Sequence, residues 1–537
     1  MNPALVSEYF NFASDIFDGW ARRRPQAQAL WCVDGVTGRE QKFTFQTLSR
    51  LSAQAANVFR AAGVRRGDRV LVMLPRVWQW WVAMLGLTRL GAVPIPGTLQ
   101  LMPRDVAYRL KVARIGAVLT SGEGIEKVGD FDGVRLAICP PPAGWVDFNE
   151  AMKKAATEYA GEPTRADDPG IIYFTSATTG EPKMVLHTQA SYGRAHRVMG
   201  ELWLDCKPGE VHWNVSDLGW GKAAWSSFYG PWHMGACVFA VDVHGKFDPG
   251  HTLDVLSQYP INTWCVPPTA LRLIVRQSLS KWKFPHLRHC VTAGEPLSPE
   301  VMRLWKSSTG LDFYEGYGQT ESIILIGNFR SLGRPVHPGS MGLPTPGFDL
   351  ALVNQNLEEV PAGSEGEIAV RVGSRRPMGL FREYWGNPEE TAAQFRNGWY
   401  LTRDRAVRDA EGYFWFIGRT DDVIKSSGYR IGPCEVESVL LEHPAVLEAA
   451  VVGKPDPVRG QIVKAFIVLR PDQEPREELK YELQQHFKHT AAPYKYPREI
   501  EFVGELPKTT SGKTRHFELR RRQAAAREED ARRKVCC

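Results

Sequence analysis

A short loop rich in hydroxyl side chains and closed by a lysine is the first stretch of the chain with residue types suited to chemistry. Residues 175–183 read Thr-Ser-Ala-Thr-Thr-Gly-Glu-Pro-Lys and follow the apolar run Ile171–Phe174. Hydroxyls and backbone N–H groups in such a loop can surround polyphosphate oxygens, and Lys183 adds a point charge. The Walker A spacing Gly-x4-Gly-Lys-Ser/Thr is absent. The loop therefore indicates a phosphate site of another type, although a plain surface turn also fits these residues when they are taken alone.

The elements around this loop follow a regular pattern. The apolar run before it predicts a buried strand, and the loop leaves the carboxyl end of that strand. Upstream, helical and strand-like patterns alternate, with helices expected over 47–62, 78–90 and 105–113 and strands over 70–74, 93–96 and 117–120. This alternation is typical of a largely parallel sheet with helices on its faces. Residues 121–168 show no pattern that orders them.

The second half of the chain changes character twice. Prolines and glycines become dense after Gly333, and short alternating stretches such as 367–372 predict a β-rich subdomain. Beyond Asp421 a compact pattern restarts, with a helix between Pro433 and His443 and strands over 446–452, 463–469 and 498–503. Its length of roughly 115 residues suffices for a separate α+β domain. We therefore predict one domain over residues 1–420 and a second over 421–537.

Composition excludes several classes of protein. The 537 residues carry a net charge of +6, and much of this charge falls in the tail after Lys513, which we interpret as a solvated helix face and not as a nucleic-acid site. The nine cysteines show no CxxC or zinc spacing, which indicates reduced thiols. The first 20 residues lack the pattern of a secretory signal or transit peptide, and the most apolar window, 77–96, is too broken to span a bilayer. We expect a cytoplasmic location.

Four further motifs follow the loop in order. They are Tyr-Gly-Gln-Thr-Glu at 317–321, Gly-Trp-Tyr-Leu-Thr-Arg-Asp at 398–404, the stretch Gly418–Ile431, and Pro-Lys-Thr-Thr-Ser-Gly-Lys at 507–513. In this order and spacing the five motifs resemble the adenylate-forming enzymes: acyl-CoA synthetases, adenylation domains of peptide synthetases, and luciferases. The finer features resemble the medium-chain acyl-CoA synthetases; these are Tyr9–Ala13, Leu74–Val77, Trp80-Trp81, Pro96–Leu101 and Ser216–Trp220.

The resemblance covers nearly the whole chain and implies an α/β fold. It implies a large N-terminal domain of two mostly parallel, helix-flanked sheets plus a β-rich subdomain. It also implies a small, mobile α+β C-terminal domain that turns about a hinge at Asp421. As an alternative, Asp421 could cap the segment that follows it, and this is compatible with a hinge.

The resemblance also assigns an ATP site. The β- and γ-phosphates would lie in the loop, with Lys183 on the leaving pyrophosphate; the loop residues are Thr175, Ser176, Thr178, Thr179 and Gly180. The adenine would lie between Tyr317 and the backbone of Gly294, Glu295 and Pro296. The ribose hydroxyls would be bound by Asp404, and Arg419 would donate to the ribose or to a phosphate. Thr320 would bind the α-phosphate, and Glu321 would hold Mg²⁺.

Two residues depart from the family pattern. Ala177 stands where the family usually has glycine, and Arg403 interrupts the usual Thr-Gly-Asp before the ribose acid. A residue at position 177 that needs a positive φ would cost about 1 kcal/mol as alanine. The extra charge of Arg403 has no explanation in the sequence.

The resemblance further implies how the two halves of the site work. Lys513 would stabilise negative charge on the α-phosphate in the transition state. In a second pose the small domain would present residues 427–429 to CoA, and Gly428 and Arg430 would be among the binding residues. Trp220 and Gly318 would line the acyl pocket. Acetate-specific relatives carry tryptophan at the position of Gly318, so its glycine predicts room for longer acids.

These assignments predict an AMP-forming acid–CoA ligase that uses a small carboxylic acid, ATP, Mg²⁺ and CoA. Two alternatives stay open at this point. One is an adenylating enzyme that transfers its acyl group to a carrier protein, and the other is a nucleotide- or acyl-adenylate-binding sensor without turnover. The sequence also leaves monomer and homodimer open, and it does not name the acid.

Overall fold

The sheets of the N-terminal region carry most of the predicted site. A computed structural model describes residues 7–175, 182–243, 245–374, 376–420, 422–426, 429–456, 458–509 and 513–523. The larger sheet has the strand order β16-β15-β14-β13-β12-β10-β11-β1-β2. Its strands are β1 (Gln28–Asp34), β2 (Glu40–Thr44), β10 (Val211–Asn214), β11 (Cys237–Asp242), β12 (Ile261–Cys265), β13 (His289–Ala293), β14 (Phe313–Gly318), β15 (Ile324–Gly327) and β16 (Leu343–Pro344). The pairings from β1 through β14 are parallel, and antiparallel strands close both edges.

A second sheet is parallel throughout. Its strand order is β4-β3-β5-β6-β7, and its strands are β3 (Arg69–Met73), β4 (Val93–Pro96), β5 (Ala117–Thr120), β6 (Val134–Ala137) and β7 (Val146–Asp147). The two large sheets confirm the predicted α/β architecture. The strand before the phosphate loop, β8 (Pro169–Phe174), is buried as predicted, but it pairs antiparallel with β9 (Met184–Thr188) in a small separate sheet completed by β19 (Glu383–Tyr384).

Helices pack against these sheets because their apolar residues recur at helical spacing. The longest are α2 (Phe45–Ala61), α3 (Trp78–Leu90), α4 (Pro103–Val112), α7 (Gln189–Val198), α10 (Pro249–Gln258) and α12 (Pro299–Thr309). Shorter ones are α1 (Asp18–Arg23), α5 (Gly122–Val128), α6 (Phe148–Lys154), α8 (Gly221–Ala223), α9 (Gly230–His233), α11 (Pro268–Ile274) and α13 (Pro388–Gln394), with π-helical turns over Phe12–Phe17, Met199–Trp203 and Ala224–Tyr229. Helix α3 is apolar on most of its surface and almost wholly buried, and Gly91 ends it at φ +75°.

The predicted β-rich subdomain is present as an antiparallel sheet. It consists of β17 (Leu350–Val353), β18 (Glu365–Arg371), β20 (Phe395–Arg396), β21 (Trp399–Arg408) and β22 (Phe414–Arg419). Strand β21 carries Arg403 and Asp404, and β22 carries Arg419 directly opposite Asp404 in the register. The backbone pairing alone therefore brings the two predicted ribose-binding residues together.

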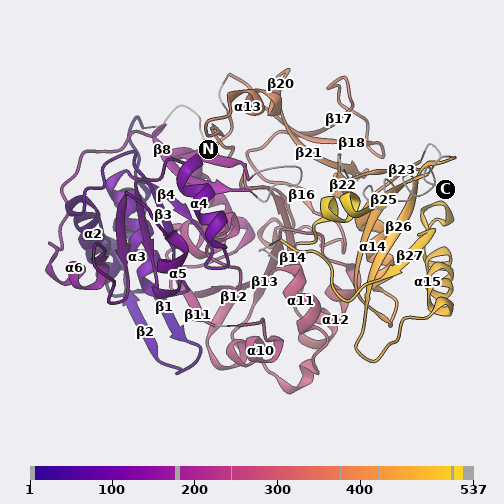
Figure 1. The fold of residues 1–537 in the computed structure, drawn as a ribbon, viewed down its shortest axis with the longest axis horizontal. Coiled ribbons are helices and arrows are strands. Elements are labelled where there is room, and N and C mark those ends of the chain that lie inside the picture. Colours follow the sequence, from indigo (N-terminus) through magenta and orange to yellow (C-terminus); the bar gives the residue numbers. More distant parts are fainter. Residues whose placement is uncertain are drawn as a thin grey trace, which may run out of the picture.

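A last sheet forms the C-terminal unit. It contains β23 (Ile424–Ser426), β24 (Tyr429–Ile431), β25 (Val446–Asp456), β26 (Gly460–Leu469) and β27 (Glu499–Phe502), with α14 (Pro433–Leu441) and α15 (Glu477–Thr490). Figure 1 shows this unit at the opposite side of the molecule from the layer that holds α2 and α3. Its apolar core is separate from those of the other sheets, as expected for an α+β domain. The domain boundary at 420/421 stays a prediction, because Asp421 lies outside the described residues.

Candidate active site

The two ends of the phosphate loop are joined where β8 and β9 meet. The backbone N–H of Thr175 donates to the carbonyl of Lys183 at 2.9 Å, and the N–H of Lys183 donates to Oγ1 of Thr175 at 3.3 Å. The structure therefore fixes the entry and exit of the loop. The residues predicted to hold the phosphates between these ends lie outside the described residues; they are Ser176, Thr178, Thr179 and Gly180, together with Ala177.

The ammonium group of Lys183 lies in a cluster of charged side chains. It contacts Oε1 of Glu390, and Nη2 of Arg403 donates to the same oxygen at 2.8 Å. The ammonium also lies 4.9 Å from the centroid of the Tyr384 ring. Lys183 first, and Arg403 after it, hold the pKa of Glu390 below its usual value. The carboxylate is therefore ionised and neutralises one of the two cations.

The predicted ribose acid, Asp404, is buried and held by neutral donors. Its Oδ2 accepts hydrogen bonds from Tyr317 Oη and from Gln319 Nε2, both at 2.6 Å. Gln319 also donates to the carbonyl of Thr402 at 2.8 Å, so its own position is fixed. On the other side of the carboxylate, Nε of Arg419 lies 3.9 Å from Oδ1 and, among the described residues, has no hydrogen-bond partner. Asp404 and Arg419 thus meet as the resemblance implied.

Thr320 and Glu321 follow β14 and are fixed by aromatic neighbours. Nε2 of His187 donates to the carbonyl of Thr320 at 2.7 Å, and the imidazole stacks on Tyr192 with ring centroids 3.8 Å apart. Burial lowers the pKa of His187 to about 3, so the ring is neutral. Tyr384 Oη donates to Oε1 of Glu321 at 2.8 Å. These contacts hold in place the backbone of Thr320, which is predicted to bind the α-phosphate, and the carboxylate of Glu321, which is predicted to hold Mg²⁺.

The residues present fit the magnesium ion that the resemblance implies. Mg²⁺ in nucleotide sites takes one or two carboxylates together with phosphate oxygens and water. Glu321 offers one carboxylate, and only its Oε1 is engaged by Tyr384. Within the part of the chain that the structure describes, no group of three or more His, Cys, Asp or Glu side chains could hold a metal ion without a ligand. Glu321 therefore suits a metal that arrives with the nucleotide.

The predicted adenine segment lies at the end of β13. Gly294 has a φ of +107°, and a Cβ there would lie 3.6 Å from Nζ of Lys222 and 3.9 Å from Cε of Lys513. Glu295 forms an ion pair with Arg272 at 3.0 Å, and Pro296 follows it. The glycine therefore keeps the backbone exposed at a point where two lysines converge.

Lys513 reaches this cavity from the C-terminal unit. Its backbone N–H donates to Thr509 Oγ1 at 3.1 Å, and Lys508 of the same turn is tied to Glu448 at 2.7 Å. Although solvent reaches the Lys513 side chain, the cavity walls remove enough water to lower its pKa, against the opposing effect of Glu295. The C-terminal unit thus inserts one cation beside the Thr320 turn.

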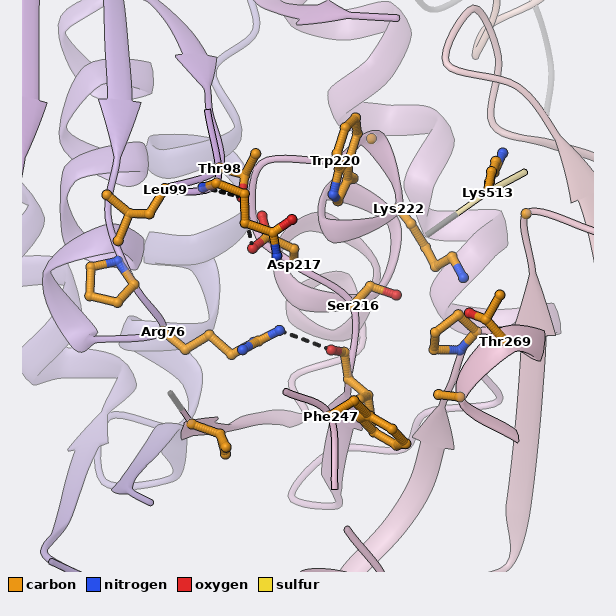
Figure 2. A pocket seen from close by; sticks show the side chains of 18 of the residues that line it. Arg76, Thr98, Leu99, Ser216, Asp217, Trp220, Lys222, Phe247, Thr269 and Lys513 are labelled. Carbon is orange, nitrogen blue, oxygen red and sulfur yellow. Dashed lines mark hydrogen bonds between the residues drawn. The ribbon is translucent and has the colours of Figure 1, made fainter. Parts of the chain in front are cut away.

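One cavity of about 740 Å³ brings together the adenine segment, the Thr320 turn and Lys513. Its wall includes Trp220, Gly318, Thr320, Glu295 and Lys513. In Figure 2 the side chains of Lys222 and Lys513 lie toward one side of the cavity and that of Arg76 lies across from them. The cavity is large enough for an acid well beyond acetate together with part of a nucleotide.

The comparison with known proteins decides the family. The sequence profile of the AMP-binding enzyme family matches residues 17–385, and that of the AMP-binding enzyme C-terminal domain matches residues 435–513. The chain belongs to the AMP-binding enzymes. It is 46% identical over 533 residues to the mitochondrial acyl-coenzyme A synthetase ACSM3 of Mus musculus, which covers 96% of this chain and 91% of that relative.

Solved structures of AMP-binding enzymes share the fold along nearly the whole chain. The anthranilate CoA ligase AuaEII in complex with anthranoyl-AMP matches with a TM-score of 0.89 and 30% identity, covering 98% of this chain and all of that one. A benzoate CoA ligase from Burkholderia xenovorans LB400 matches with a TM-score of 0.83 and 28% identity, covering 95% of this chain and all of that one. Both neighbours act on aromatic acids by their names.

The comparison corrects one expectation. The ACSM3 and ACSM4 relatives are named as mitochondrial, so the cytoplasmic location predicted from the sequence is wrong. Reduced thiols argue against an oxidising compartment, but they do not separate the cytosol from other reducing compartments. Among the described residues no helix is long and apolar enough to cross a membrane.

For some predicted site residues of this AMP-binding enzyme the structure gives a position, and for others it does not. Asp421 and Gly428 lie outside the described residues, and so does the side chain of Arg430. Trp220 and Gly318 lie on the cavity wall. A Cβ built on Gly318, however, would lie 2.5 Å from the carbonyl oxygen of Ile323. The glycine is thus required by the close approach of β15, whatever room it also leaves for the acid.

Sequence reasoning missed several residues that shape the site. Gln319 lies within the Tyr317–Glu321 motif and could have been found from it, because an amide can donate to the ribose acid while accepting from another group; it accepts from Tyr400 Oη at 2.7 Å. Lys222 lies two residues after Trp220 and carried no signal of its own. His187, Tyr384 and Glu390 act through pairings between distant segments, which no local pattern reveals.

Proposed function

We propose that the chain is an ATP-dependent acid–CoA ligase. It forms acyl-CoA from a medium-chain, short branched or aromatic carboxylic acid through an acyl-adenylate, and it releases pyrophosphate and AMP. The observation that carries the proposal is the presence of Lys513 in the same cavity as Thr320 and Trp220, in a chain that resembles acyl-coenzyme A synthetases over 96% of its length. Its substrates are the acid, ATP and CoA.

In the first step a carboxylate oxygen of the acid attacks the α-phosphorus, and the bond from that phosphorus to pyrophosphate breaks. Negative charge grows on the α-phosphate oxygens during this step. Lys513 and the Thr320 turn line the space where this charge develops, so they stabilise the transition state more than the ground state. Mg²⁺ held by Glu321 would neutralise charge on the phosphates when bound.

The nucleotide is oriented by the pair Asp404 and Arg419. Because Tyr317 and Gln319 both occupy Oδ2 of Asp404, Oδ1 remains to accept from a ribose hydroxyl. Nε of Arg419 has no hydrogen-bond partner in the described part of the chain, which supports a further contact with the ribose or a phosphate. These contacts fix the α-phosphate relative to the cavity, which lowers the entropic part of the barrier.

In the second step the CoA thiol loses its proton, the sulfur attacks the carbonyl carbon of the adenylate, and AMP leaves as the C–O bond breaks. Lys513 has no role in this step, so the family's rotation of the small domain about Asp421 can withdraw it. The hinge and the CoA residues Gly428 and Arg430 are proposals from the resemblance alone.

The cavity supports an acid larger than acetate. Its volume of about 740 Å³ and its tryptophan wall suit an apolar chain or ring. The aromatic acids named for two structural neighbours agree with this range. Apolar pockets discriminate by only about 1–3 kcal/mol per methylene, so a broad chain-length profile is expected.

A screen of straight-chain, branched and aromatic acids with ATP and CoA tests the proposal, with AMP release as the readout. We expect thioester with free CoA and acid-dependent exchange of labelled pyrophosphate into ATP. Thioester formed only on carrier proteins would point to the acyl-transfer alternative. Absence of exchange with every acid would leave a binding protein without turnover.

A further inference from the structure

Arg403 has a backbone conformation that arginine rarely adopts. It lies within β21 at a φ of +60°, the left-handed region that favours glycine. Its backbone N–H donates to Oε1 of Glu367 at 2.8 Å, which holds the residue in place. Strained residues persist where the surroundings fix them, and they gather at binding sites. A charged side chain at a position that favours glycine therefore needs an explanation.

The guanidinium of Arg403 is directed at the phosphate end of the site. It shares Oε1 of Glu390 with the ammonium group of Lys183, so two cations flank a single oxygen atom. Lys183 ends the phosphate loop, and the residue after Arg403 is the ribose acid Asp404. Arg403 is thereby placed between the part of the site that holds the ribose and the part that holds the loop.

The contacts around Lys183 continue to the predicted metal residue. The Tyr384 ring lies 4.9 Å from the Lys183 ammonium, and its hydroxyl donates to Glu321 at 2.8 Å. Tyr384 therefore links the cluster of Arg403, Glu390 and Lys183 to the carboxylate suited to Mg²⁺. Phosphates that extend from an α-phosphate at Thr320 past a metal ion at Glu321 would approach this cluster.

The charges of this cluster do not balance. Among the residues that the structure describes, two cations share the carboxylate of Glu390, so their charges exceed that of their partner by one. The side chains are also accessible, with exposed fractions of 37% for Arg403, 33% for Lys183 and 25% for Glu390. A polyanion that approaches this wall can replace the carboxylate and bind both cations at once, and the planar guanidinium suits two phosphate oxygens.

We infer that Arg403 is a second pyrophosphate-binding cation, which acts with Lys183 on the terminal phosphates of ATP and on the pyrophosphate that leaves. Glu390 occupies both cations until these phosphates arrive. The inference rests on the proposed ligase function, and it concerns a residue that replaces the glycine usual in the resembled family. It also explains why arginine is present at this position despite the left-handed conformation.

A structural ion pair is the competing explanation, and substitutions at two positions separate them. Arg403→Gln removes the charge and keeps a long side chain in the left-handed region, whereas Arg403→Gly removes both charge and strain. Arg371→Gln is the matched control, because Arg371 is a half-exposed arginine of β18 that pairs with Asp349 at 3.0 Å and with Glu359 instead of Glu390. Glu390→Gln releases both cations.

The readout is acid-dependent exchange of labelled pyrophosphate into ATP, with the half-saturating pyrophosphate concentration measured for each variant. We expect this concentration to rise roughly tenfold in both Arg403 variants, as for loss of one charge-assisted hydrogen-bonding group, and to fall in Glu390→Gln. Arg403→Lys should restore part of the loss. Inhibition by AMP should stay constant, because AMP lacks the terminal phosphates.

Two results overturn the inference. One is an unchanged pyrophosphate requirement in Arg403→Gln and Arg403→Gly relative to Arg371→Gln. The other is an equal weakening of AMP and pyrophosphate, which would mean that Arg403 acts through Asp404. Failure of the ligase proposal looks different, since the unsubstituted protein would then show no acid-dependent exchange.

Discussion

The hydroxyl of Tyr317 donates to Oδ2 of Asp404 at 2.6 Å, so an aromatic residue and a buried acid from two different sheets form one unit. Burial raises the pKa of Asp404, and Arg419, Tyr317 and Gln319 oppose this shift. Tyr317 was assigned to the adenine face from the sequence. Its hydroxyl has a second task, which is to hold the carboxylate that is expected to bind the ribose.

Replacing Tyr317 with Phe tests this second task. The ring remains, but Asp404 loses one of its two donors and its Oδ2 is free to turn away from the ribose position. We expect the half-saturating ATP concentration to rise roughly tenfold, as for loss of a hydrogen bond to a charged group. The turnover rate at saturating ATP should change less. An unchanged ATP requirement would show that Gln319 alone positions the acid.

Replacing Lys513 with Ala should separate the two half-reactions. Adenylation should lose several orders of magnitude, because the charge that develops on the α-phosphate loses its cation. Thioester formation from supplied acyl-adenylate should be nearly normal. Lys508→Ala is the matched control, because this lysine of the same turn is paired with Glu448 outside the cavity. Equal loss in both half-reactions would contradict the two-pose scheme.

The buried histidines predict a loss of stability in acid. Burial lowers the pKa to about 3 for His187, His196 and His212 and to about 4 for His233 and His289. The folded state keeps these rings neutral, whereas the unfolded chain takes up protons below its ordinary value of roughly 6.5. The stabilisation is complete above that pH and is lost as the pH falls toward the folded values.

Denaturant unfolding between pH 7 and pH 5 measures this effect. Each such histidine should contribute a slope of about 1.4 kcal/mol per pH unit near the lower end of this range. His196 is fully buried and contacts the carbonyl of Tyr192 through Nδ1 at 2.6 Å. His196→Gln should reduce the pH slope of the unfolding free energy by the contribution of one proton. An unchanged slope would mean that the ring is charged in the folded state.

Much of the fold could be predicted where local pattern and termination signals agree. The ranges 78–90, 93–96 and 117–120 match α3, β4 and β5, because apolar spacing and a stop such as Gly91 both act locally. Residues 121–168 could not be ordered, because their strands are short and depend on non-local pairing for their stability: β6 pairs with β5, and β7 pairs with β6.

Strand order and side-chain partners could not be predicted from local pattern. Strand β1 pairs with β11 about two hundred residues later, and only the packed core selects that partner. The same holds in the site. The motifs named Asp404 and Lys183, whereas Glu390 and Tyr384 become part of the site only when α13 and β19 fold against β9 and β21.

Replacing Gly318 with Trp should both narrow the acid range and cost stability. The new side chain would reduce the space at the cavity wall, which should shift preference toward acetate or propionate. Because a Cβ at this position would approach the carbonyl oxygen of Ile323 to 2.5 Å, β14 and β15 must also separate. Overpacking of this kind costs about 1–3 kcal/mol. Rates for butyrate and octanoate, measured beside a thermal unfolding curve, check both effects.

Gly318→Ala serves as the control for the steric effect. It should lower the unfolding temperature while leaving the acid profile nearly intact, since a methyl group adds little volume to the cavity. Unchanged butyrate and octanoate rates in the tryptophan variant would show that position 318 does not limit the length of the acid.

Lys222 and Lys513, the two lysines that line the cavity, repel each other electrostatically. Lys222 belongs to the N-terminal region and Lys513 to the C-terminal unit. Burial lowers the pKa of both lysines, and Lys513 lowers the pKa of Lys222 further. The repulsion between these two cations therefore opposes the approach of Lys513 to this cavity, whereas Glu295 favours it. Acid and ATP are both anions, so their binding would offset this repulsion and favour the pose in which Lys513 lies in the cavity.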